Sequence, residues 1–248
     1  MNLEKLYIIV IYYFCMLSIV IPTYNESKNL TTLFDLISKS LKREKYEIII
    51  SDDNSPDGTS ELAKKLSAKY PIRVLDRYKN PGLSESVVDG IKIAYGDVIC
   101  VMDADLQHPP EVIKKLLNEI KYYDLVVASR LVEGGGTEDW PKERAITSYI
   151  ATFLAKPLTK INDPMSGFFM FKKDKIDINK IKPRGYKILL EIAVKSEIKK
   201  IKEVPFIFKD RTLGTSKLTF KVNILYLLQL ISLYYYVIVR KINRIFNF

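Results

Sequence analysis

Val98-Ile99-Cys100-Val101-Met102-Asp103-Ala104-Asp105 is an apolar run that ends in two carboxylates at alternate positions. Leu106-Gln107-His108-Pro109-Pro110-Glu111 follows at once. The order predicts a buried β-strand that stops at a loop. Mg²⁺ and Mn²⁺ bind carboxylate oxygens and commonly share them with substrate phosphates. The stretch therefore predicts a metal and phosphate site at the carboxyl end of a strand, where open α/β sheets bind ligands. By itself, the pair of aspartates would also fit a solvated turn.

Two earlier apolar runs end in the same way. Leu17 to Ile21 leads into Pro22-Thr23-Tyr24-Asn25-Glu26, and Tyr46 to Ile50 leads into the polar cluster from Ser51 to Thr59. Each cluster alone would fit turn or helix-cap chemistry. In a parallel sheet, however, the three strand ends lie on one edge. We therefore expect one crevice that gathers side chains from all three clusters, namely Tyr24, Glu26, Asp53, Asp103 and Asp105.

Strand-like runs and helical stretches alternate along the chain from Leu17 onward. Strands are predicted near 17–21, 46–51, 72–75, 97–102 and 124–128, with helices near 28–43, 58–69, 83–95 and 110–121. This alternation is typical of parallel strands with right-handed crossovers. The second half predicts an amphipathic stretch over 140–160, a turn and strand over 163–171, a helix near 186–196 and a strand near 201–208. Gly134-Gly135-Gly136 predicts a loop between the halves, either a plain linker or a lid that moves when substrate binds.

The C-terminal segment from Val222 to Val239 contains no charged residue. At ~1.5 Å per residue these eighteen residues span roughly 27 Å, close to the ~30 Å hydrocarbon core of a bilayer. Basic residues flank the segment on both sides, and they are Lys217, Lys221, Arg240, Lys241 and Arg244. We favour a membrane helix that either spans the bilayer or lies in the headgroup layer. The alternative is a helix buried against the domain or a partner subunit.

Composition narrows the function classes. The 248 residues suffice for one large α/β domain, and the net charge of +10 suits anionic partners such as phosphate substrates or anionic lipid. Zinc-finger spacing and aromatic RNA-binding motifs are absent from the sequence, so no nucleic-acid partner is expected. His108 is the single histidine, which excludes a multi-histidine zinc site and favours a role in local loop structure. Cys15 and Cys100 lie in apolar runs, predicting buried thiols rather than a disulfide.

The status of residues 1–16 is left open by the sequence. Leu6 to Phe14 is apolar and aromatic, but no small-residue cleavage site of a signal peptide precedes the first strand. Met16 stands directly before that strand and is a second candidate start, so residues 1–16 are treated as an N-terminal extension.

Several motifs together resemble a known family. Pro22 to Glu26, Asp52 to Thr59 and Asp103 to Glu111 resemble the family 2 glycosyltransferases. Asp163 to Phe169 and Arg211 to Leu218 narrow the resemblance to the dolichyl-phosphate mannose synthase branch. The resemblance implies an α/β fold of the Rossmann-like, nucleotide-sugar transferase (GT-A) type, with a mostly parallel sheet flanked by helices. It also implies a catalytic domain over residues 17–218, and a C-terminal hydrophobic, membrane-associated helix with a basic tail over residues 219–248.

The function that this resemblance implies is transfer of mannose from GDP-mannose to dolichyl phosphate or another polyprenyl phosphate. The reaction is expected to be inverting, to depend on Mg²⁺ or Mn²⁺, and to occur at a membrane with the catalytic domain facing the cytoplasm. The first alternative is a polyprenyl-phosphate glucosyltransferase that uses UDP-glucose, whose members often carry aspartate where His108 stands. The second alternative is a non-catalytic, basic scaffold bound to the membrane. A scaffold would not need Asp103, Asp105, Gln107, Arg211 and Lys217 together.

The resemblance also implies the roles of individual residues. Asp105 and Gln107 are expected to hold the metal, with Asp103 as a candidate third ligand. Arg130 and Arg144 are expected to bind the acceptor phosphate together with Ser148, and Asp105, Arg130 and Arg144 are the expected catalytic groups. A lipid phosphate is already anionic near neutral pH, so no strong general base is required. The expected donor-binding residues are Pro22, Tyr24, Glu26, Ser51, Asp53, Asp103, Ala104, Asp105, Gln107, Lys187, Arg211 and Lys217.

Overall fold

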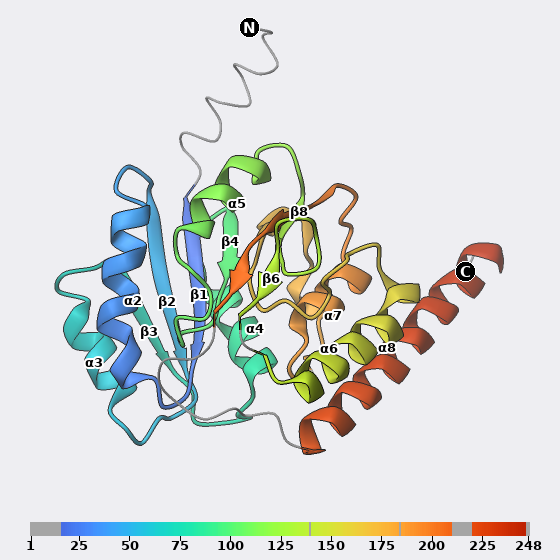
Figure 1. Cartoon of the computed structure of the whole chain (residues 1–248), viewed down its shortest axis with the longest axis horizontal. Coiled ribbons are helices and arrows are strands. Elements are labelled where there is room, and N and C mark those ends of the chain that lie inside the picture. The colour runs from blue at the N-terminus through green and yellow to red at the C-terminus, as the bar shows by residue number, and fades with distance from the viewer. Residues whose placement is uncertain (1–15, 139, 184, 210–219, 247–248) are drawn as a thin grey trace, which may run out of the picture.

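A seven-stranded, mostly parallel sheet forms the centre of the protein (Figure 1). The computed structural model describes residues 16–138, 140–183, 185–209 and 220–246. The strand order is β3-β2-β1-β4-β7-β5-β8, and only β7 runs antiparallel to its two neighbours. The strands are β1 (Leu17–Thr23), β2 (Tyr46–Asp52), β3 (Ile72–Asp76), β4 (Val98–Val101), β5 (Leu125–Ser129), β7 (Phe169–Lys172) and β8 (Ile201–Pro205).

Helices cover both faces of this sheet because successive strand residues point to opposite sides. Ile19 and Ile21 of β1 belong to one hydrophobic core, together with residues of α2 (Ser27–Ser40), α3 (Thr59–Leu66) and α5 (Val112–Ile120). Val20, between them in sequence, belongs to a second core with α4 (Leu83–Ile93) and α7 (Ile188–Lys195). The predicted alternation of strands and helices is confirmed, as is the mostly parallel, helix-flanked sheet.

The sheet contains one strand whose position the sequence did not predict. β7 lies between β4 and β5, although it follows them by a long stretch of chain. Its register pairs Cys100 with Met170 and Val126 with Met170. Such a non-local pairing depends on the whole chain being folded, and it leaves no local periodicity to read.

The predicted strand near 201–208 is interrupted at Phe206. The N–H of Phe206 donates to the carbonyl of Ser129 at 3.1 Å, and the chain then continues as β9 (Ile207–Phe208). β9 pairs in parallel with β6 (Gly136–Thr137), which follows the first two glycines of the Gly134-Gly135-Gly136 loop. The glycine loop is thus joined to a small second sheet and is more than a plain linker.

The C-terminal helix α8 (Phe220–Phe246) lies beside α6 (Lys142–Ala155) along one side of the molecule (Figure 1). Within the described chain it is the one helix long and apolar enough to cross a membrane, over Val222–Asn243 with a mean hydropathy of 1.8. Leu230 and Leu233 on its inner face pack against Met165 and Leu190 of the domain. The hydroxyl of Tyr226 also donates to the carbonyl of Ala151, at 2.5 Å.

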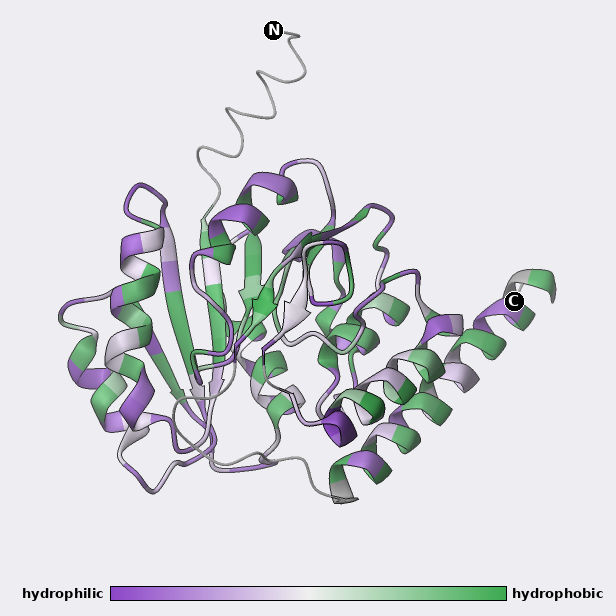
Figure 2. Ribbon diagram, viewed as in Figure 1, coloured by the Kyte–Doolittle hydropathy of each residue, from purple (hydrophilic) through white to green (hydrophobic). Residues whose placement is uncertain are grey.

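Hydrophobic residues, green in Figure 2, recur along α8, and those on the face away from the domain are exposed. Its exposed side chains are Ile224, Leu227, Leu228, Ile231, Tyr235, Ile238, Ile242 and Ile245. Burial against the domain, which the sequence left as an alternative, therefore holds for one face of the helix only.

We expect the two faces of α8 to respond differently to the same truncation. Leu230→Ala removes a side chain that is 4% exposed and should lower the free energy of unfolding by about 2–5 kcal/mol. Ile231→Ala, at a side chain that is 66% exposed, should change it by no more than about 0.5 kcal/mol. Urea denaturation in mild detergent measures both values. Equal effects of the two substitutions would contradict the packing of α8 on the domain.

Candidate active site

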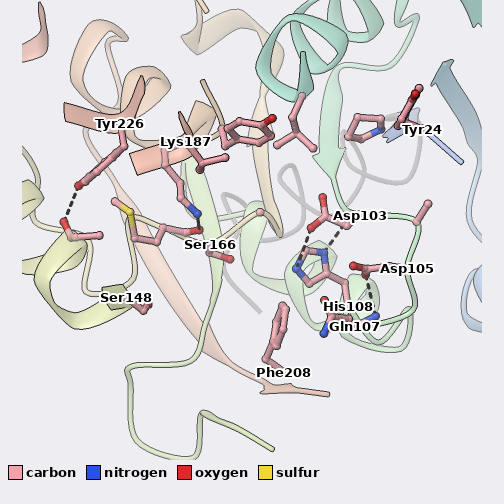
Figure 3. A pocket seen from close by; sticks show the side chains of 18 of the residues that line it. Tyr24, Asp103, Asp105, Gln107, His108, Ser148, Ser166, Lys187, Phe208 and Tyr226 are labelled. Carbon is pink, nitrogen blue, oxygen red and sulfur yellow. Dashed lines mark hydrogen bonds and ion pairs between the residues drawn. The ribbon is translucent and has the colours of Figure 1, made fainter. Parts of the chain in front are cut away.

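The carboxyl ends of β1, β2 and β4 open into a cavity of about 450 Å³, whose other wall is formed by α6 and α8. We call it the central pocket. In Figure 3, Asp103, Asp105 and His108 lie on one side of it, and Lys187 and Ser148 lie on the other. Twelve of the expected site residues line it, and they are Pro22, Tyr24, Glu26, Asp53, Asp103, Ala104, Asp105, Gln107, Arg130, Arg144, Ser148 and Lys187.

Three expected donor residues remain, and the structure describes one of them, Ser51. Ser51 is completely buried, and its hydroxyl donates to the carbonyl of Ser86 at 2.8 Å. It joins β2 to α4 and supports the strand end that carries Asp53. Arg211 and Lys217 lie outside the described residues.

The loop after β4 holds its polar side chains through local hydrogen bonds. Oδ1 of Asp105 accepts from the N–H of Gln107 at 3.1 Å, and Nε2 of Gln107 donates to the carbonyl of Lys209 at 2.9 Å. Leu106 between them has φ = 63°, a left-handed backbone that is unusual for leucine. Asp105 and Gln107 are 3% and 2% exposed, so both side chains are almost fully desolvated. The loop is therefore rigid where it faces the pocket.

The donor atoms of this loop fit a hard divalent cation. Asp105, Gln107 and Asp103 offer carboxylate and amide oxygens, which Mg²⁺ and Mn²⁺ prefer. Within the described part of the chain, no group of three or more His, Cys, Asp or Glu side chains is arranged to hold a metal by itself. Mg²⁺ is usually bound by one or two carboxylates together with substrate phosphates. The residues thus fit an ion whose coordination is completed by a phosphorylated substrate.

His108 holds the same loop in place through its side chain. Its Nδ1 accepts a hydrogen bond from the N–H of Asp103 at 3.0 Å, and its ring stacks on Phe168 with centroids 5.1 Å apart. Gly167 lies against both groups, because a Cβ there would be 3.2 Å from Oδ2 of Asp103 and from Cε1 of His108. These contacts agree with the predicted structural role of His108.

Asp53 is held at the end of β2 by two partners. Its Oδ2 accepts from the N–H of Gly82 at 2.8 Å, and its Oδ1 pairs with the guanidinium of Arg77. Burial raises the pKa of the Asp53 carboxyl above its ordinary value, whereas the Gly82 N–H and Arg77 act in the opposite direction. Arg77 also binds Asp89, with Nε 3.0 Å from Oδ2. The carboxylate is therefore fixed in orientation before any ligand arrives.

Two arginines converge on the opposite side of the pocket. Arg130, directly after β5, forms a bidentate pair with the fully buried Asp163, with both N···O distances at 2.7 Å. Arg144, in the first turn of α6, places its guanidinium carbon 4.2 Å from the ring centroid of Trp140. Ser148 follows one turn later on the same helix, so it faces the same side as Arg144. This wall of the pocket suits an anionic group.

Lys187 brings a third cation into the pocket wall. Its ammonium lies 3.5 Å from the carbonyl of Met165. Burial of the ammonium, and next the positive charge of Arg130, lower the pKa of Lys187 to about 8. An unfolded lysine keeps its proton to higher pH, so burying this charge costs stability at pH 7, and the cost falls as the pH rises above 8. An anion bound nearby would raise this pKa and offset the cost.

Sequence reasoning missed three residues of this site. Arg77 follows the end of β3, a fourth strand end at the same edge, but no motif marks it. Trp140 and Phe208 contact both Arg130 and Arg144. The available signal was the single tryptophan of the chain, four residues before Arg144.

The chain is similar to known transferases over most of its length. The family model described as glycosyl transferase family 2 matches residues 18–178. A dolichol-phosphate mannosyltransferase of Pyrococcus furiosus is 47% identical over 215 residues, which is 85% of this chain and 61% of that protein. This chain therefore spans less than two thirds of the length of that relative. A dolichol-phosphate mannosyltransferase of Saccharomyces cerevisiae is 39% identical over 231 residues, covering 88% of this chain and 86% of that protein.

Solved structures support the fold. A glucosyl-3-phosphoglycerate synthase from Mycobacterium tuberculosis, in complex with Mn²⁺, UDP-glucose and phosphoglyceric acid, matches with a TM-score of 0.63 at 17% identity, over 91% of this chain and 80% of that chain. A complex of the synthase with Mn²⁺, UDP and glucosyl-3-phosphoglycerate matches with a TM-score of 0.60 at 18% identity, over 84% of this chain and 75% of that one. The predicted GT-A type of fold is thus confirmed. With the family model and the yeast relative covering most of the chain, this protein belongs to glycosyl transferase family 2, among the dolichol-phosphate mannosyltransferases.

Proposed function

We propose that this protein transfers mannose from GDP-mannose to the phosphate of dolichol or another polyprenol, as a membrane-associated enzyme. The observation that carries the proposal is the arrangement of the central pocket, with an oxygen-donor loop on one side and two arginines on the other. The relatives from Pyrococcus furiosus and Saccharomyces cerevisiae are dolichol-phosphate mannosyltransferases, which supports mannose as the sugar and dolichol phosphate as the acceptor. The same pocket argues against a non-catalytic scaffold, which gains nothing from buried, oriented carboxylates.

The donor is proposed to bind along the ends of β1, β2 and β4. Asp53 and Glu26 present carboxylates, which accept hydrogen bonds from ribose hydroxyls and from base N–H groups. Guanine offers adjacent N–H donors on one edge, whereas uracil offers a single N–H between two carbonyls, so acidic side chains favour guanine. Asp105 and Gln107, with Asp103 beside them, are proposed to hold Mg²⁺ or Mn²⁺, which neutralises the charge of the departing diphosphate. The Mn²⁺ and UDP of the structural neighbour support this assignment. On motif evidence, Arg211 and Lys217 would add positive charge there.

The acceptor is proposed to bind on the arginine side. Arg130 and Arg144 orient the lipid phosphate through charge-assisted hydrogen bonds, and Ser148 adds a hydroxyl. A phosphate oxygen attacks the anomeric carbon from the side opposite the leaving diphosphate, so the configuration inverts. Positioning and charge stabilisation supply the rate enhancement, because the nucleophile is already ionised.

The first test concerns the metal loop. Asp105→Asn keeps the size of the side chain but removes its charge, and it should lower Mn²⁺-dependent mannose transfer by at least about a hundredfold. Isothermal titration of GDP should show that Mn²⁺ strengthens binding to the wild type but not to the variant, with UDP binding more weakly than GDP to the wild type. Glu119→Gln, on the helix that follows the loop, also removes one negative charge and serves as the charge-matched control. Full transfer by Asp105→Asn would remove this residue from the metal site, and tighter binding of UDP would favour the glucosyltransferase alternative.

The second test separates donor from acceptor. Arg144→Ala removes one cation from the acceptor side, so the KM for a short polyprenyl phosphate should rise about tenfold or more, while the KM for GDP-mannose stays within about twofold. Steady-state assays with each substrate varied in turn measure both constants. A rise confined to the donor would reverse the assigned roles.

We further propose that α6 and α8 together bind the membrane surface, with the catalytic domain on the cytoplasmic side. α6 exposes large apolar side chains, including Tyr149 at 72% and Phe153 at 66%. It lies beside α8 (Figure 1), which also has exposed apolar side chains. Contiguous apolar surface of this kind marks a membrane or protein interface. The inner face of α8 is bound to the domain, which supports a helix lying along the lipid surface rather than leaving the domain to span the bilayer.

Binding to vesicles tests this surface. Phe153→Ser combined with Ile231→Ser should weaken co-sedimentation with phosphatidylcholine and phosphatidylglycerol vesicles at least about tenfold, since each side chain loses apolar contact area. Tyr122→Ser, at an exposed aromatic residue beyond α5, should leave binding unchanged. Unaltered binding of the double variant would contradict membrane contact through this surface.

A further inference from the structure

Two aromatic rings each lie close to both arginines of the proposed acceptor side. The guanidinium carbons of Arg144 and Arg130 are 4.2 Å and 5.1 Å from the ring centroid of Trp140. The same two carbons are 5.7 Å and 5.6 Å from the centroid of Phe208. The two rings meet edge to face, with centroids 5.5 Å apart and an interplanar angle of 84°. We call Trp140 and Phe208 the aromatic platform.

Separate chain segments assemble this platform. Phe208 belongs to β9, and the N–H of Glu138 donates to its carbonyl at 3.0 Å, which fixes the chain just before Trp140. Gly135 permits the close turn, because a Cβ there would lie 2.5 Å from the carbonyl oxygen of Ser129 and 3.0 Å from the carbonyl group of Arg130. The glycine loop therefore folds directly over the end of β5, and Trp140, which follows it, lies beside the two arginines.

An aromatic ring holds a cation in a way that suits an anion site. The face of the ring attracts a guanidinium through its quadrupole, and a ring that contacts both arginines attracts each of them. Asp163 already holds Arg130, and the rings add to this contact without adding a further negative charge that would repel the incoming phosphate. The indole N–H of Trp140 is buried without a hydrogen-bond partner among the described residues. The ring is therefore placed by packing and by the arginines rather than by its own polar group.

We propose that Trp140, supported by Phe208, is a positioning residue that sets Arg130 and Arg144 for the phosphate of the acceptor. This inference rests on the proposed function for the identity of the phosphate, a lipid phosphomonoester. The platform gathers guanidiniums from β5 and α6 before the acceptor arrives, and so reduces the ordering that binding would otherwise require. No contact between Trp140 and the transferred sugar is needed.

Steady-state kinetics of two variants at Trp140 test whether the aromatic platform positions the arginines. Trp140→Leu removes the π face, and the KM for a short polyprenyl phosphate should rise about tenfold, because two cation–π contacts are lost. Trp140→Phe keeps a ring and should hold the rise below about threefold, while the KM for GDP-mannose and the affinity for GDP with Mn²⁺ stay unchanged in both. Equal acceptor KM values in the leucine and phenylalanine variants, or a parallel rise for donor and acceptor, would overturn the proposal. Phe208→Leu provides the same comparison if Trp140→Leu does not fold.

Fluorescence separates this proposal from the proposed function. Trp140 is the only tryptophan in the chain, so its emission in the wild-type protein reports directly on the platform. Titration with inorganic phosphate should change the emission in a saturable way, and Arg144→Ala should abolish the change. If phosphate changes the emission but no lipid phosphate is mannosylated, the platform stands and the proposed function fails. If saturating phosphate leaves the emission unchanged while mannosyl transfer proceeds, the platform fails and the proposed function stands.

Discussion

The buried ion pair between Arg130 and Asp163 is the interaction on which the two sides of the pocket depend. Asp163 is fully buried, and it accepts from both the side chain and the backbone N–H of Arg130. Its own N–H donates to Glu203 of β8 at 3.1 Å. Removal of one partner from such a pair leaves an uncompensated charge in the interior, at a cost of roughly 3–5 kcal/mol. The pair therefore fixes the end of β5 against the turn that precedes β7.

The same turn also contacts the loop after β4, which carries Asp103 and His108. Ser166 donates to the carbonyl of Ala128 in β5 at 2.7 Å, and Gly167 lies directly against Asp103 and His108. One short segment thus contacts Arg130 at one end and Asp103 at the other. Because β7, which follows, is inserted between β4 and β5, the sheet itself holds these two contacts at a constant separation. The antiparallel strand is the structural reason why the proposed donor side and the proposed acceptor side face each other across one pocket.

Much of this arrangement could be predicted from the sequence. The rest could not be predicted, for physical reasons. The edge that gathers Tyr24, Glu26, Asp53, Asp103 and Asp105 follows from three apolar runs that each stop at polar residues, since parallel strands end together. The insertion of β7 and the break at Phe206 depend on contacts between distant segments, which no local pattern records. Arg77 and Trp140 were missed for a related reason, because their roles come from the side chains they touch. The composition of α8 predicts a membrane segment, but side chains that pack it on the domain, such as Leu230 and Leu233, are apolar like those of its outer face, so hydropathy alone does not separate the two faces.

Helix α6 has one further consequence. It carries Arg144 and Ser148 toward the pocket, and within the next few residues it exposes Tyr149 and Phe153 on the other side. At a rise of ~1.5 Å per residue, Arg144 and Ser148 are only about one to two helical turns away from the outward-facing Tyr149 and Phe153. If these aromatic residues lie among the lipid headgroups, the helix fixes how deep in the headgroup layer the proposed phosphate site lies. The polyprenol then has no need to be extracted from the bilayer, and turnover should depend on the isoprene units nearest the phosphate while remaining insensitive to those further along the chain.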